Sequence, residues 1–236
     1  MTTALVTGSA KRVGKEIALY LAEKGFNIAL HCNTSKKDAE ETSKEIREKK
    51  VTCKIFQCEL QNEKKLLQLI PEVKKKFPDL ALLFNCASIY EPSQMKDGNS
   101  ELLDRQFAVN FKAPYLLSGS FAQHCKKGLI INMIDSNFIK NVTTNSAYLL
   151  SKKAVAEMTT MAALEFAPDI RVNGIAPGLT MLSAKETEEH MKKWIQSIPL
   201  KIRPELSYLF KTIQFFIDNP YITGQIIFVD GGAHLK

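Results

Sequence analysis

A tyrosine and a lysine lie four residues apart in Tyr148-Leu-Leu-Ser-Lys152, and Asp135 lies thirteen residues before the tyrosine. Side chains four residues apart share one face of a helix, so we expect the Tyr148 phenol and the Lys152 ammonium to lie together. A nearby positive charge favours the phenolate, which lowers the tyrosine pKa and eases proton transfer near neutral pH. The pair is also common on solvated helices, and Asp135 also suits a plain turn. The pattern predicts acid–base chemistry if the fold brings all three groups together.

A second segment has the composition of a phosphate-binding turn. Thr7-Gly8-Ser-Ala-Lys11-Arg12-Val13-Gly14 follows a strand-like run and leads into a helical pattern. Glycines let backbone amides approach a pyrophosphate, and the start of the next helix offers unpaired N–H groups and the positive end of its dipole. The segment therefore predicts a dinucleotide site, with a tight strand-to-helix turn that holds no ligand as the alternative.

These segments resemble the short-chain dehydrogenase/reductase family. The family's Thr-Gly-x-x-x-Gly-x-Gly turn is present with Gly8 and Gly14, while Arg12 stands at the middle glycine. Most members carry a serine where Asp135 stands. An arginine in the turn and an aspartate thirteen residues before the tyrosine are similar to pteridine reductases in particular. Tyr90, five residues after Asn85, matches the aromatic residue that stacks on the pterin in those enzymes.

The resemblance implies an NADPH-dependent reductase that transfers hydride to a C=N bond of a dihydropterin-type substrate. Tyr148 would supply the proton, Lys152 would orient the nicotinamide ribose and lower the phenol pKa, and Asp135 would hold the ring or assist its protonation. Ser136 keeps a carbonyl or 3-oxoacyl-thioester reductase open, because a shift of one residue would present its hydroxyl instead. A third possibility, from another class, is a non-catalytic protein that senses NADP(H).

Cofactor preference is expected to be decided after the second strand, where a carboxylate would bind the ribose of NAD and repel a 2′-phosphate. Asn33, Thr34 and Ser35 stand there, followed by two lysines. The absence of a carboxylate favours NADPH/NADP+, although pteridine reductases often carry an arginine where Thr34 stands.

The resemblance implies three sets of contacts and no metal site. The catalytic residues are Asp135, Tyr148, Lys152 and Asn110, the last as the family asparagine that holds a proton-relay water. Substrate contacts are Ser88, Tyr90, Asp135 and Tyr148. Cofactor contacts, which include Glu59 at the adenine, are Gly8, Lys11, Arg12, Val13, Gly14, Asn33, Thr34, Ser35, Glu59, Asn85, Ala87, Ser88, Tyr148, Lys152, Pro177, Gly178 and Thr180.

Strand-like runs that alternate with helical patterns must position these residues. We expect strands over 3–7, 27–32, 52–58, 80–85, 128–133, 170–175 and 225–229, and helices over 15–24, 37–49, 63–77, 103–123, 147–166 and 205–216. The alternation predicts a Rossmann-type α/β fold: a doubly wound, seven-stranded parallel sheet with helices on both faces, in a single domain over 1–236. The irregular stretches 88–100 and 179–199 begin at carboxyl ends of strands and are the expected substrate loops.

Composition narrows the alternatives. The 236 residues are 45% hydrophobic and 24% charged, as in ordinary globular proteins. The net charge is +7, but the lysines of 36–50 alternate with acidic residues without interleaved aromatics, so we expect no nucleic-acid partner. No apolar run approaches the roughly 18 residues of a membrane helix, and no signal-peptide pattern is present, which predicts a cytoplasmic protein. The odd, scattered cysteines fit free thiols better than disulfides or a zinc site.

The helical pattern that carries Tyr148 predicts self-association. Over 147–164 it is apolar around much of its circumference, so it can bury a second face against another subunit. The resemblance implies a homotetramer, while core burial alone is the alternative.

Overall fold

Seven parallel strands form the centre of the molecule. The computed structural model describes residues 2–181 and 187–236, and the strands pair in the order β3-β2-β1-β4-β5-β6-β7. Each strand lies within two residues of a predicted run, so the expected Rossmann-type sheet is confirmed. The strands are β1 (Thr3–Val6), β2 (Asn27–Cys32), β3 (Cys53–Gln57), β4 (Leu80–Asn85), β5 (Gly128–Met133), β6 (Ile170–Pro177) and β7 (Ile226–Val229).

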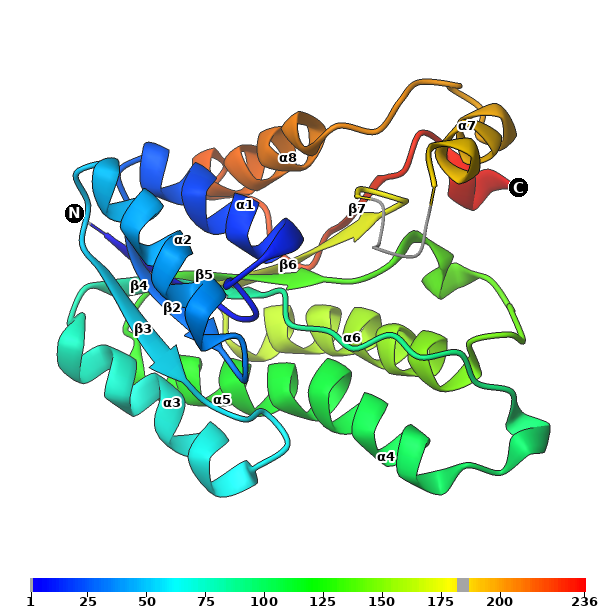
Figure 1. Cartoon of the computed structure of the whole chain (residues 1–236). Helices are drawn as coiled ribbons and strands as arrows, with labels where there is room; N and C mark the ends of the chain where they lie inside the picture. The colour runs from blue at the N-terminus through cyan, green and yellow to red at the C-terminus, as the bar shows by residue number, and fades with distance from the viewer. Residues whose placement is uncertain (1, 182–186) are drawn as a thin grey trace.

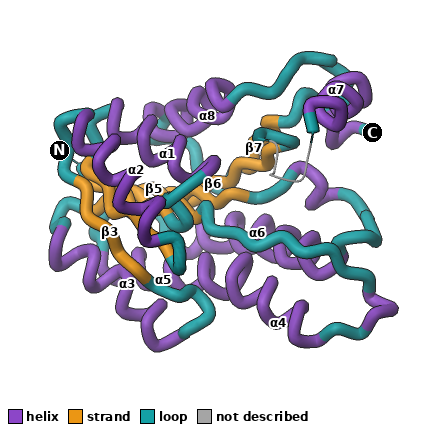
Figure 2. The backbone as a smooth tube through the Cα atoms, viewed as in Figure 1, coloured by secondary structure: helices purple, strands orange, loops and turns teal. Residues whose placement is uncertain are grey.

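Helices cover both faces of this sheet, which Figure 2 shows as one orange layer between purple helices. Successive side chains of a strand point to opposite faces. Ala4 and Val6 therefore pack into the core beneath α1 (Arg12–Glu23), α2 (Lys36–Glu48) and α8 (Leu206–Asp218). Leu5 packs into the core on the other face, which α3 (Glu63–Lys76), α5 (Ala113–His124) and α6 (Ser146–Glu165) cover (Figure 1). Burial on both faces explains why the strands are apolar without alternation.

The helix predicted over 103–123 is interrupted. The structure has α4 (Ser100–Phe107), the π-helical turn η2 (Ala108–Lys112) and then α5. Single π-turns widen a helix locally and are frequent at functional sites. Here the widened turn contains Asn110, which is buried.

The second predicted substrate loop contains a helix that the sequence analysis did not foresee. Thr187 caps α7 (Glu188–Ser197) through a hydrogen bond from the His190 amide to its Oγ1, at 3.3 Å. The helix packs mainly through buried Met191, and the Trp194 ring lies against Gly178. Residues 182–186 of this predicted loop lie outside the described residues. The first predicted loop is irregular to Gln94 and then forms η1 (Met95–Asp97) before α4.

The strand order reverses between β1 and β4, because the chain moves from β1 to β2 and β3 and then returns to the other side of β1. In open parallel sheets ligands bind at such a switch point, beyond the carboxyl ends of the strands. The turns that follow β1, β2, β3 and β4 meet at this end of the sheet and line one cavity there.

Candidate active site

The fold brings the predicted phenol and carboxylate into contact. Tyr148, in the first turns of α6, donates a hydrogen bond from Oη to Oδ2 of Asp135 at 3.0 Å. Asp135 follows β5 and caps η3 (Ser136–Ile139), its Oδ1 accepting from the amide of Asn137 at 2.8 Å. One carboxylate oxygen is thus fixed by backbone while the other faces the phenol.

Lys152 lies behind this pair, one helical turn after Tyr148. Its side chain is buried, its Nζ donates to the carbonyl oxygen of Met133 at 2.9 Å, and Nζ lies 5.7 Å from the centre of the Tyr148 ring. Burial lowers the pKa of Lys152 to about 8, against the opposing effect of the Asp135 carboxylate. The three predicted groups therefore form one cluster at the end of β5.

The expected lowering of the tyrosine pKa is not found. Burial raises the pKa of Tyr148 well above its ordinary value, and the charge and hydrogen bond of Asp135 raise it further. The physical reason is that the phenol donates to a carboxylate in a poorly solvated place, while the Lys152 ammonium is directed to a backbone carbonyl. A neutral phenol that already donates its proton suits an acid in a reduction.

Ser136 does not take the place of Asp135. It lies in η3 and is 3% exposed, whereas the Asp135 side chain makes the contact with Tyr148. The one-residue shift that would present the Ser136 hydroxyl to the phenol is not present. A carboxylate, not a hydroxyl, therefore faces the acid.

The first predicted substrate loop is fastened to the start of α6 by Ser93. The Ser93 amide donates to the carbonyl of Thr144, its carbonyl accepts from the amide of Ser146, and its Oγ accepts from the amide of Ala147, each at 3.1 Å. These three bonds, here called the Ser93 latch, supply the start of α6 with a cap from outside the helix. The latch places the loop beside the first residues of α6.

Tyr90 lies in the same loop and contacts Tyr148. The two rings meet edge to face, with their centres 4.9 Å apart and their planes at 84°. Apart from this contact Tyr90 lies at the surface, and 59% of the residue is exposed. It therefore presents an aromatic surface to solvent at the place where a flat ring would stack.

Asn110 uses its whole side chain within the protein. Its Oδ1 accepts from the Ile89 amide at 2.8 Å and from Ser88 Oγ at 3.1 Å. Its Nδ2 donates to the Ile89 carbonyl at 2.9 Å and to Ser151 Oγ at 3.2 Å. Asn110 therefore acts as an interior hydrogen-bonding residue within the π-helical turn. Its four bonds tie the loop after β4 to α6.

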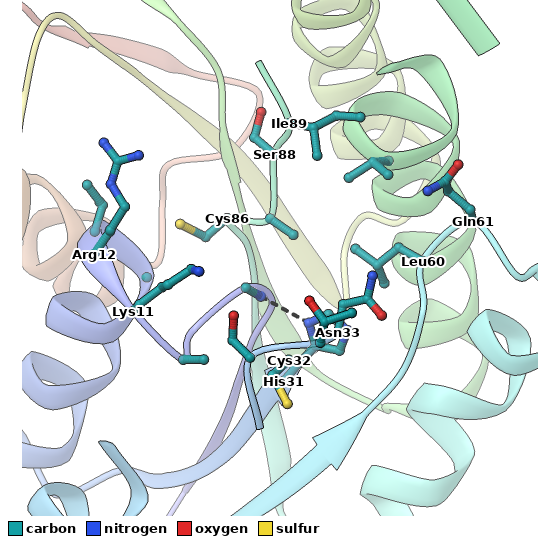
Figure 3. A pocket seen from close by; sticks show the side chains of 18 residues that line it. Lys11, Arg12, His31, Cys32, Asn33, Leu60, Gln61, Cys86, Ser88 and Ile89 are labelled. Atoms are coloured by element: carbon teal, nitrogen blue, oxygen red, sulfur yellow. Dashed lines mark hydrogen bonds between the residues drawn. The ribbon is translucent and has the colours of Figure 1, made fainter. Parts of the chain in front are cut away.

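The predicted glycine turn opens onto a cavity of about 430 Å³. Figure 3 shows the residues that line it, with Lys11 and Arg12 on one side and Asn33, Leu60 and Gln61 on the other. Ten of the predicted cofactor residues are among its lining: Gly8, Lys11, Arg12, Val13, Gly14, Asn33, Thr34, Ser35, Ala87 and Ser88.

The turn geometry fits a dinucleotide. A Cβ on Gly14 would lie 2.3 Å from the Gly8 carbonyl oxygen, and one on Gly8 would lie 2.9 Å from Ala87 Cα, so both positions require glycine. Arg12 adopts a φ of +54° where glycine is the usual residue. No Asp or Glu is found among the described residues of the cavity wall, whereas two cations are. Such a wall favours a phosphate over a bare ribose hydroxyl.

The remaining predicted cofactor residues lie outside this wall. Glu59 is exposed, and the next two residues, Leu60 and Gln61, line the cavity instead. Asn85 is buried and donates to Asn132 Oδ1 at 2.8 Å, which ties β4 to β5. Pro177 is the last residue of β6, Gly178 follows it beside Trp194, and Thr180 lies two residues further along the chain.

Several lining residues were not predicted. Ile89 and Val109 each lie beside a predicted residue, whereas His31 and Cys86 are polar groups at the carboxyl ends of otherwise apolar strands. A polar residue at the end of an apolar strand is the feature of the sequence that could have identified these two as lining residues. Within residues 2–181 and 187–236, no group of three or more His, Cys, Asp or Glu is placed to hold a metal ion. Nor is any helix of that part long and apolar enough to cross a membrane.

Known proteins are similar to this chain over most or all of its length. The family model "short chain dehydrogenase" matches residues 2–193. The 3-oxoacyl-[acyl-carrier-protein] reductase FabG of Staphylococcus epidermidis is 29% identical over 241 residues, which cover 99% of each chain. General stress protein 39 of Bacillus subtilis is 29% identical over 97% of this chain and 83% of its own. The crystal structure of FolM alternative dihydrofolate reductase 1 from Brucella suis, in complex with NADP, is 34% identical with a TM-score of 0.94, covering 100% of this chain and 96% of that one.

Proposed function

The chain belongs to the short-chain dehydrogenase family, and from this premise we propose that it reduces a C=N bond of a dihydropterin-type substrate with NADPH. It is an oxidoreductase of the family, and its cofactor is NADP(H). The substrate class is the part that we infer. The observation that carries it is the hydrogen bond of 3.0 Å between Tyr148 Oη and Asp135 Oδ2.

A reduction of C=N needs a hydride at carbon and a proton at nitrogen. NADPH supplies the hydride when it is bound. Tyr148 gives its Oη proton to the ring nitrogen as the hydride reaches the carbon; its raised pKa means that this proton is present at neutral pH. Asp135, released from the phenol, accepts a hydrogen bond from an N–H of the ring, which a serine hydroxyl would do less strongly than a charged acceptor. Lys152 holds positive charge behind the phenol as the proton leaves.

The Tyr90 ring is placed to hold the plane of the substrate. It contacts Tyr148 and has its other surface exposed, and the Ser93 latch keeps its loop at the start of α6. Aligning the reacting atoms supplies much of the rate in such reactions. The likeness to FolM, whose name gives it as a dihydrofolate reductase, supports the same substrate class.

A second candidate is a 3-oxoacyl-thioester or other carbonyl reductase, which the FabG relatives favour. Purified protein with NADPH should be assayed against a panel of dihydropterins and dihydrofolate and, separately, against an acetoacetyl thioester. We expect turnover of the first set only. Asp135→Ser should abolish dihydropterin reduction while Ser136→Ala leaves it within about twofold, because the buried hydroxyl makes no contact with the reacting groups. Thioester turnover that Ser136→Ala removes would instead establish the carbonyl reductase.

Two further features belong to this proposal. The outer surface of α5 and α6 exposes Tyr115, Leu150, Met161 and Leu164, around a groove of about 860 Å³, and we assign this apolar face to a second copy of the chain within a homotetramer. Light scattering should show a smaller particle for Met161→Glu.

All five cysteines are free thiols, which supports a reducing, cytoplasmic location.

A further inference from the structure

His31 lies at the carboxyl end of β2, inside the core and against the cofactor cavity. Its side chain is 1% exposed, and both ring nitrogens have partners. Nδ1 lies 3.0 Å from the amide nitrogen of Gly8, and Nε2 lies 2.9 Å from the carbonyl oxygen of Cys58. Figure 3 draws the first of these bonds as a dashed line at His31.

The two partners fix a single state of the ring. A carbonyl oxygen can only accept, so Nε2 must carry the hydrogen. An amide can only donate, so Nδ1 must keep its lone pair. His31 is therefore the neutral Nε2–H tautomer, in agreement with burial, which lowers its pKa to about 4. A protonated ring would confront the Gly8 amide with a second N–H group.

Backbone groups of His31 form hydrogen bonds with Ser9, the residue that follows Gly8 in the turn. The Ser9 amide donates to the His31 carbonyl at 2.9 Å, and the His31 amide donates to Ser9 Oγ at 3.2 Å. Ser9 Oγ in turn donates to the Val6 carbonyl at 2.7 Å. We call this set, together with the two ring bonds, the His31 clamp. It fastens the start of the glycine turn to the ends of β2 and β3.

The turn needs such a fastening. Gly8 has a φ of +66° and Arg12 a φ of +54°, and the latter is a conformation that non-glycine residues adopt at a cost. Lys11, the N-cap residue of α1, provides no side-chain cap in the described structure. Apart from the Ser9 hydroxyl, the Gly8 end of the turn is therefore held by contacts with neighbouring segments, of which the His31 ring is one.

We propose that His31 is a positioning residue for NADP(H), which orients the Gly8 peptide through its Nδ1 lone pair and so holds the glycine turn ready for the cofactor phosphates. The inference goes beyond the proposed function, because it concerns cofactor binding and holds for any substrate. A pterin assay that fails leaves it untouched, and its own test uses NADPH alone.

Two variants separate the two ring bonds. Asn places Oδ1 where Nδ1 stands and keeps the acceptor for Gly8, whereas Gln places Nε2 where the ring Nε2 stands and keeps the donor to Cys58. Calorimetric titration with NADPH should give His31→Asn a Kd within about threefold of the natural protein and His31→Gln a Kd raised about 10-fold, because an unpaired buried amide is costly. A merely structural histidine predicts equal Kd values for both variants, and that result would overturn the proposal.

A matched control tests whether general loss of stability explains the effect. Thr3 stands at the opposite end of β1, is fully buried, and donates to Asp79 Oδ1 at 2.8 Å. Thr3→Val should lower the melting temperature and leave the NADPH Kd unchanged.

A measurement on the unaltered protein keeps the proposal testable if a variant does not fold. Nitrogen-15 NMR of the His31 ring at pH 7 should show a protonated Nε2 and an unprotonated Nδ1, with or without NADPH. A ring with its proton on Nδ1, or a ring protonated on both nitrogens, would refute the role.

Discussion

The cofactor end and the substrate end of the molecule are built from different interactions. Around the cavity, neutral groups hold the turns: the His31 clamp fastens the glycine turn, and Thr7 Oγ1 accepts from the amides of Cys86 and Ala87 at 2.9 and 3.0 Å. At the end of β5, ionisable groups contact one another, as in the hydrogen bond of Tyr148, whose pKa is raised, to Asp135. The first set joins neutral side chains to backbone groups, and the second joins ionisable side chains to one another.

This difference explains what similarity can and cannot identify. A cofactor site formed by the turns after the strands is expected wherever the sheet and its turns persist, and relatives with different printed activities match 99% and 100% of this chain. In the proposed function a few side chains select the substrate, and Asp135, which stands where most members of the family are expected to carry a serine, is the main one. A single residue at the end of β5 is therefore expected to change the substrate without changing the cofactor.

The largest expected effect tests the substrate end alone. Tyr148→Phe removes the acid and should lower kcat by about 10²–10⁴-fold, with the NADPH Kd changed by less than about threefold. Steady-state assays and calorimetric titration measure the two quantities. Tyr221→Phe, at a fully exposed side chain, should leave both unchanged. A loss that appears mainly in NADPH affinity would show that the two ends are not separable in this way.

The pH dependence of stability tests whether the cofactor end is held by a neutral group. Burial lowers the pKa of folded His31 from 6.5 to about 4. The unfolded chain binds the proton first, so the stabilisation is complete above pH 6.5 and is lost as the pH falls toward 4, by about 3 kcal/mol. Denaturant unfolding of the natural protein should show this additional slope relative to His31→Asn. If the free energy of unfolding had the same pH dependence in both proteins, the folded His31 ring would take up its proton in the same pH range as the unfolded chain, which would contradict the prediction.

Arg12 combines the two kinds of interaction, because it places a charged side chain on the glycine turn, which neutral groups otherwise hold. Arg12→Gly should raise the NADPH Kd about 10-fold through loss of one charged contact. The same change should stabilise the fold by about 0.5–1 kcal/mol, since glycine adopts a φ of +54° without strain. Lys50→Gly, at a φ of +64° on the exposed surface, is the matched control and should stabilise the fold without affecting NADPH. Unchanged affinity in Arg12→Gly would remove the guanidinium from the site.

The smallest expected effect concerns the Ser93 latch. Ser93→Ala removes the acceptor of the Ala147 amide and should raise KM for the dihydropterin about 3-fold, with the NADPH Kd unchanged. Ser93→Thr keeps the hydroxyl and should restore the natural KM. A change in NADPH affinity instead would show that the latch acts on the cofactor end, against the separation described above.

The strands could be predicted closely because burial on both faces leaves a strong pattern, as in Leu129-Ile-Ile131. α7 was not predicted: most of its residues are polar, and Met191 is its only buried residue, so little in its composition marks it as part of the core. The π-turn at Asn110 was not predicted either: the four hydrogen bonds of its central side chain are to other segments, and a local sequence pattern does not show them.

The site shows the same limit. Spacing placed Tyr148, Lys152 and Asp135 in one cluster, but the direction of the tyrosine pKa shift depends on which group the ammonium faces, and spacing does not determine that. Glu59 and Gln61 are two residues apart, and only the path of the chain after β3 determines which of them lines the cavity. Orientation at strand ends is a property of three-dimensional packing, which a local pattern does not carry.

The contact between Trp194 and Gly178 has a practical consequence. Trp194 is the chain's single tryptophan, and a Cβ on Gly178 would lie 2.9 Å from its ring, so all indole emission originates beside the turn where the nicotinamide is expected. Reduced nicotinamide absorbs light in the range where indole emits. Occupancy of the cofactor site can therefore be followed as fluorescence quenching in unlabelled protein.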